Sequence, residues 1–150
     1  MTDKNLKSVL RAIVRESAPE LRVKFSDTTE YDHTHEIVYL APHDFKEDLG
    51  FMRHLREVHK CKWADKINVV LWATMHEVGH YYTLDDCEED DYEVRAACAM
   101  VSTEEAAASI AIQDRYYNLE SEWAATEWAI QYIKKNKAKF IELSRKIEED

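Results

Sequence analysis

Residues 71–82 read LWATMHEVGHYY, an apolar run of helical length in which His76 and His80 stand four positions apart. On an α-helix, side chains at positions i and i+4 lie one turn apart on the same face. Both imidazoles can therefore bind one ion that lies about 2 Å from each ligand nitrogen. Glu77 lies about 100° further round the helix, where it reaches a water on that ion more easily than the ion itself. The segment predicts a helix that carries part of a zinc hydrolase site.

This motif resembles the HExxH sequence of the zincin metallopeptidases. The longer zincin pattern also requires uncharged neighbours, and these are Thr74, Val78, Gly79, Tyr81 and Tyr82. The resemblance implies a zinc-dependent peptidase in which Glu77 is the general base. The alternative is an ordinary core helix, but buried histidines and a buried glutamate would each need a polar partner. Gly79 adds weak support, because glycine within a helix often marks the close approach of another backbone.

Composition limits the kinds of partner. The 150 residues suit a single domain, 1–150, with one hydrophobic core. A formal net charge of −10 repels phosphate backbones and anionic membranes, so we expect neither nucleic acid nor a membrane as a direct partner. Charged N-terminal residues and an odd number of cysteines, Cys61, Cys87 and Cys98, indicate a reduced, cytoplasmic protein.

The remaining patterns predict a mostly helical α+β fold, a minimal zincin-like domain. Apolar residues recur at helical spacing over 5–17 and alternate with polar residues over 21–26. A polar turn at 27–32 leads to a second strand at 37–40. The two strands are expected to form a hairpin or the edge of a small N-terminal sheet.

Further helices are expected on both sides of the HExxH motif. The first begins with a capping box at Asp44 and Glu47, runs to about His59, and buries Phe45, Leu49, Met52 and Leu55. The active-site helix is expected from near Asp65 to Tyr82. Later helices are predicted from a capping box at Ser102 and Glu105, from a cap at Asn118, and at the C-terminus with Phe140, Leu143 and Ile147 inward. The acidic run at 85–91 is interpreted as a solvated loop.

A catalytic zinc ion needs a third protein ligand and an open position for water. His80 is the last histidine of the chain, so a downstream histidine is excluded. The helix after Asn118 offers Glu120, Glu122 and Glu127. Glu122 alone among them shares a stripe with apolar residues, namely Leu119, Ala125, Ala129, Tyr132 and Ile133. An inward carboxylate needs a cation as partner, and we expect Glu122 to be the third ligand.

Other arrangements stay open. The first-turn amides of the helix could stabilise Glu122 without a metal. Asp86 lies where some secreted zincins place an aspartate ligand, but those enzymes have glycine where this chain has Thr83. Glu120 is a further alternative to Glu122. His33 and His35 are expected in a solvated turn.

Residues 121–126, SEWAAT, resemble the Asn-Glu-x-x-Ser/Ala-Asp motif of the gluzincins at Glu122 and Ala125. The chain departs from it at Ser121 and Thr126. In that family the aspartate orients a ligand histidine, so this chain must use another orienting group or bind metal less firmly. Trp128 and the order of elements over 5–133 resemble the small intracellular ImmA/IrrE-like metallopeptidases of bacteria and phages.

These observations predict a metallopeptidase with one Zn²⁺ ion, held by His76, His80 and Glu122, that acts on a protein or peptide. The second strand, 37–40, is expected to present its edge to an extended substrate. The candidates for stabilising the oxyanion are Tyr81, Tyr116 and Tyr117. Two alternatives remain: an inactive zincin-like binding or regulatory protein, and a hydrolase that acts on another acyl group.

Overall fold

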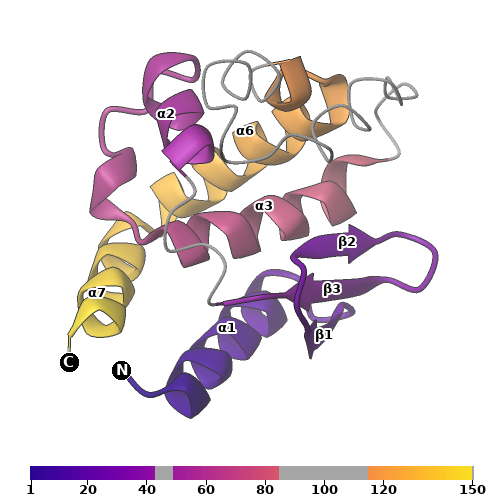
Figure 1. The fold of residues 1–150 in the computed structure, drawn as a ribbon, viewed down its shortest axis with the longest axis vertical. Helices are drawn as coiled ribbons and strands as arrows, with labels where there is room; N and C mark the ends of the chain where they lie inside the picture. Colours follow the sequence, from indigo (N-terminus) through magenta and orange to yellow (C-terminus); the bar gives the residue numbers. More distant parts are fainter. Residues whose placement is uncertain (43–48, 85–114, 150) are drawn as a thin grey trace.

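The computed structural model describes residues 1–42, 49–84 and 115–149, and this part has a mostly helical α+β fold (Figure 1). Its elements, in chain order, are α1 (Asp3–Ser17), β1 (Arg22–Phe25), β2 (Glu30–Asp32), β3 (Ile37–Leu40), α2 (Leu49–Glu57), a 3-10 turn (Ala64–Lys66), α3 (Val69–Thr83), α6 (Glu120–Lys135) and α7 (Lys137–Glu148). The predicted mostly helical α+β class is confirmed.

Helix α3 lies at the centre of the molecule, with α6 on one side and α1 and the sheet on the other (Figure 1). A helix in this position must be apolar almost all round, and every residue from Val70 to Met75 is buried. Asn68 caps its first turn, because the Asn68 side chain accepts a hydrogen bond from the Val70 amide at 2.9 Å. The helix therefore begins at Val69, and the predicted start near Asp65 was wrong.

The three strands lie in the order β1-β3-β2, with β1 parallel and β2 antiparallel to β3. Of the two expected arrangements, a hairpin between 21–26 and 37–40 was therefore wrong, and a small N-terminal sheet with 21–26 at its edge is confirmed. The hairpin joins β2 to β3 instead, and β2 lies within the segment predicted as a polar turn. The apolar pattern of a strand indicates which face is buried, but not which neighbour it pairs with. A short strand at the edge, such as β2, carries too few apolar residues to be recognised.

The expected substrate edge also needs correction. Strand β3 is the central strand and is hydrogen-bonded on both sides, so it has no free edge. Its position explains its composition, because Ile37, Val38 and Leu40 are all buried. Of the two edge strands, β2 has the more extensive contact with α3.

The helical predictions hold wherever the structure describes the chain, except at the ends. Helix α1 starts with Thr2 as its cap, and α7 buries Phe140 as expected. Helix α6 is capped at Leu119 without a side-chain hydrogen bond, so the predicted cap at Asn118 was wrong. The expectations for Asp44, Phe45 and Glu47, for the acidic run with Asp86, and for the capping box at Ser102 and Glu105 fall outside the described residues.

Gly79 lies at the crossing of α3 and α6. A Cβ atom at this position would lie 2.5 Å from the carbonyl oxygen of Ala125 and 3.0 Å from its Cα. No side chain fits there unless the two backbones separate. The expectation that Gly79 marks the close approach of another backbone is confirmed.

Replacing Gly79 with alanine should therefore destabilise the protein. Overpacking against a backbone costs about 1–3 kcal/mol, which at this separation should exceed the roughly 1 kcal/mol that alanine gains in helix propensity. Denaturant unfolding of the Gly79→Ala variant should show a lower free energy of unfolding than wild type. An unchanged or higher value would mean that α3 and α6 do not approach each other this closely.

Candidate metal centre

Two of the three candidate ligands come from α3. His76 and His80 lie one turn apart and turn their rings to the same side of the helix, with ring centroids 4.7 Å apart. Both residues are buried, at 6% and 8% exposure. Phe51 of α2 packs edge-on against the His76 ring at 5.5 Å and fills the space beside it. Packing against Phe51 thus restricts the orientation of the His76 imidazole.

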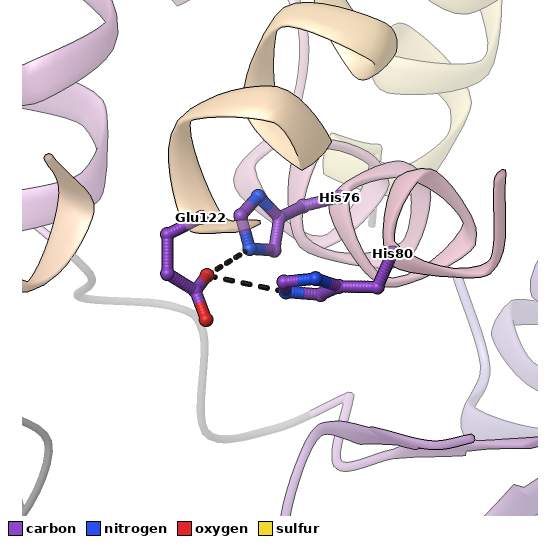
Figure 2. A group of neighbouring side chains, drawn as sticks. All are labelled: His76, His80 and Glu122. Carbon is purple, nitrogen blue, oxygen red and sulfur yellow. Dashed lines mark hydrogen bonds and ion pairs between the residues drawn. The ribbon is translucent and has the colours of Figure 1, made fainter. Parts of the chain in front are cut away.

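The third candidate ligand comes from the first turn of α6. Oε2 of Glu122 lies 2.7 Å from Nε2 of His76 and 3.2 Å from Nε2 of His80 (Figure 2). Glu122 is only 2% exposed, so the prediction that it faces inward is confirmed. Glu120, the rival on the same helix, is exposed and is not part of this group.

The three donor atoms could hold one metal ion. They lie within 4.8 Å of one another, and each comes from a different buried side chain. Two imidazole nitrogens and one carboxylate oxygen form a donor set common in catalytic zinc sites. Ligand atoms about 2.0–2.1 Å from a tetrahedral zinc ion lie about 3.3 Å apart. Oε2 of Glu122 lies 3.2 Å from Nε2 of His80, near that value, and 2.7 Å from Nε2 of His76, a hydrogen-bond distance. In the described part of the chain this is the one group of three or more potential ligands that converges in this way.

The charge of Glu122 also suits a ligand. Burial raises the pKa of this carboxyl, but the hydrogen bonds from His76 and His80 outweigh burial and hold the pKa well below its ordinary value. Glu122 is therefore ionised at neutral pH. A buried carboxylate with two imidazoles around one of its oxygens is ready to bind a cation.

A cavity of about 140 Å³ opens beside two of the candidate ligands, His76 and Glu122. Helices α2, α3 and α6 line this cavity, together with the residue before β2 and two residues that precede α6. The lining residues are Thr29, Phe51, Ala73, His76, Glu77, Tyr116, Tyr117 and Glu122. Glu77 is partly buried, and burial raises the pKa of its carboxyl although the nearby histidines oppose this shift. A carboxylate with a raised pKa at the wall of such a cavity is suited to accept a proton.

The three candidate tyrosines have different environments. The Tyr116 hydroxyl donates to Oε1 of Glu122 at 2.9 Å, so it holds the carboxylate oxygen that faces away from the histidines. Tyr81 points away from the cavity, because its hydroxyl donates to Glu20 at 3.1 Å. Tyr117 lines the cavity and packs against Phe51. Tyr81 is therefore a poor candidate for the oxyanion, and Tyr116 contacts the site most directly.

Thr126 lies behind His76. Its Oγ1 atom is 3.0 Å from Nδ1 of His76, and the residue is completely buried. This is the position at which the gluzincin motif has an aspartate. By residue type Thr126 departs from the motif, but in the structure it makes a polar contact with His76.

A second cluster of polar and aromatic side chains, which the sequence did not predict, packs against α6 near Glu122. The His59 side chain is fully buried and stacks on Trp123 with ring centroids 3.9 Å apart. Nδ1 of His59 lies 2.5 Å from Oε1 of Glu127. Nε2 of His54 lies 3.3 Å from Oδ1 of Asn118. These contacts join α2 and the segment after it to the start of α6. Histidines scattered between helices give no periodic signal from which this cluster could have been found.

The remaining predicted histidines behave as expected. His33 and His35 are exposed in the turn between β2 and β3. Nδ1 of His35 lies 2.8 Å from Oδ2 of Asp32, which is a local contact of the turn. Asp86, the other proposed third ligand, lies outside the described residues.

Comparison with known proteins adds no family assignment. No family model matches the chain, and no curated protein or solved structure matches it either. In the parts of the chain that the structure describes, no helix has both the length and the apolar content needed to cross a bilayer. The function of the protein is therefore inferred from the geometry of this site.

Proposed function

We propose that the protein is a zinc-dependent metallopeptidase of the gluzincin type, in which His76, His80 and Glu122 hold one zinc ion. The observation that supports this most strongly is the convergence of three buried donor atoms from two helices. A second supporting feature is the adjacent cavity, which Glu77 lines. The HExxH motif alone would supply only two of the ligands and the base.

Bound by these side chains, zinc would act as a Lewis acid that lowers the pKa of a water molecule to about 7. Glu77 would accept the proton of the attacking water and then donate it to the leaving amine. Tyr116 would keep Oε2 of Glu122 directed at the histidines by holding Oε1. The apolar contact with Phe51 would limit the access of bulk water to His76.

The substrate that we propose is a protein segment in an extended conformation. Strand β2 lies at the edge of the sheet next to α3, and Thr29, directly before it, lines the cavity. An extended peptide can add to such an edge through main-chain hydrogen bonds. A reducing, cytoplasmic setting is also part of the proposal, supported by the buried free thiol of Cys61.

The test combines metal analysis with a digest of a broad peptide library. We expect the purified protein to contain one zinc ion per chain and to cleave peptides. A chelator should abolish cleavage, and added zinc should restore it. Bound zinc without cleavage of any library member would favour the alternative, a zincin-like binding protein. Absence of zinc after exposure to the metal would contradict the proposed site.

A further inference from the structure

Helix α6 contacts both nitrogens of the His76 ring. Glu122 lies near Nε2 and Thr126, one helical turn later, lies near Nδ1. Residues at i and i+4 share a helix face, so one face of α6 holds the ring at both ends. The close crossing at Gly79 and Ala125 brings that face within reach of α3.

We infer that Thr126 is a positioning residue for His76: its hydroxyl oxygen accepts the Nδ1–H and leaves the lone pair of Nε2 for the metal. This inference rests on the proposed zinc site and extends it. A ligand histidine usually donates its other ring N–H to a fixed acceptor, which sets both the tautomer and the orientation of the ring. Thr126 is completely buried, so water does not compete for this hydrogen bond.

The kind of acceptor at Nδ1 of His76 affects how strongly this histidine binds the metal. A hydroxyl is neutral, whereas the aspartate of the gluzincin motif is charged, and a charged acceptor makes the stronger hydrogen bond. A neutral hydroxyl attracts the Nδ1 proton less strongly than a carboxylate does. Nε2 of His76 therefore donates less electron density to the metal than it would with an aspartate partner. We expect a site that binds zinc through a correctly directed ring, but less tightly than a carboxylate partner would allow.

The experiment measures zinc affinity by competition with a chromophoric chelator. Thr126→Val keeps the shape of the side chain and removes the acceptor, and it should weaken zinc binding about 10-fold or more. Thr126→Ser restores the hydroxyl and should bind zinc nearly as tightly as wild type. The melting temperature of each metal-free variant reports separately on packing.

Thr74 provides a matched control. It is also completely buried, but its hydroxyl donates to the main-chain carbonyl of Val70 at 2.8 Å and not to a ligand. Thr74→Val should leave zinc affinity unchanged.

Two results would overturn the inference while wild type still binds zinc. One is equal affinity in Thr126→Val and wild type. The other is a loss in Thr126→Ser as large as that in Thr126→Val, because serine keeps the hydroxyl and its presence would then not determine the zinc affinity. Failure of wild type itself to bind zinc would instead refute the proposed metal site, so the two failures are distinguishable.

Discussion

The Glu77→Gln variant should bind zinc as tightly as wild type and cleave peptides about 10²–10⁴-fold more slowly. Glutamine has nearly the shape of glutamate but cannot accept the proton of the attacking water. Glu77 lines the cavity and does not belong to the ligand group, so its replacement leaves all three donor atoms in place. Zinc content and the turnover of a library-derived peptide, measured on the same preparation, test this expectation. Unchanged cleavage would remove Glu77 from the mechanism.

The same variant has a second, independent readout. Burial raises the pKa of Glu77 above its ordinary value of 4.5, so the native state binds this proton more tightly than the unfolded state does. The stability of the metal-free protein therefore falls as the pH rises from 4.5 through the raised pKa. Glutamine does not ionise, so the Glu77→Gln variant does not lose stability in this way as the pH rises. Metal-free Glu77→Gln should melt above wild type at neutral pH, and the difference should vanish well below pH 4.5.

Replacing Glu122 with glutamine should weaken zinc binding by more than about 100-fold, because loss of a partner outside the ligand set alone costs 10–100-fold. The substitution preserves volume but removes the negative charge that His76 and His80 surround. Activity should be lost together with the metal. Affinity is measured with a competing chelator, and excess zinc should restore part of the activity.

Glu120→Gln is the control for this loss. Glu120 lies in the same first turn of α6, but it is exposed and is not part of the ligand group. The control should bind zinc and cleave peptides as wild type does. If Glu120→Gln lost zinc and Glu122→Gln kept it, the third ligand would be misassigned.

Much of the candidate site was predictable because its signals are local. Two histidines four positions apart share a helix face in any α-helix, and Glu77 follows from the same geometry. Glu122 could be chosen over Glu120 because only Glu122 lies on the apolar stripe of its helix. The first helix, both predicted strands and the mostly helical character were likewise evident from periodicity, which depends on nearby residues alone.

Other features depend on which segments meet, and periodicity carries no information on that. The parallel pairing of β1 with β3 and the edge position of β2 follow from how the sheet packs on α3. The role of Tyr116 was undetermined for the same reason, since three tyrosines lie near the motifs in sequence and the contact with Glu122 separates Tyr116 from the others.

Thr126 shows most clearly the difference between what local sequence patterns predict and what the packing of distant segments decides. Judged by residue type, it was a departure from a motif that calls for a charged group. In the folded chain, Gly79 lets α3 and α6 approach until the carbonyl oxygen of Ala125 in α6 lies only 2.5 Å from where a Cβ atom would be. At that distance a short hydroxyl side chain reaches the His76 ring. The ligand pair follows from the pitch of a single helix, whereas the partner of His76 exists only because two helices pack this closely.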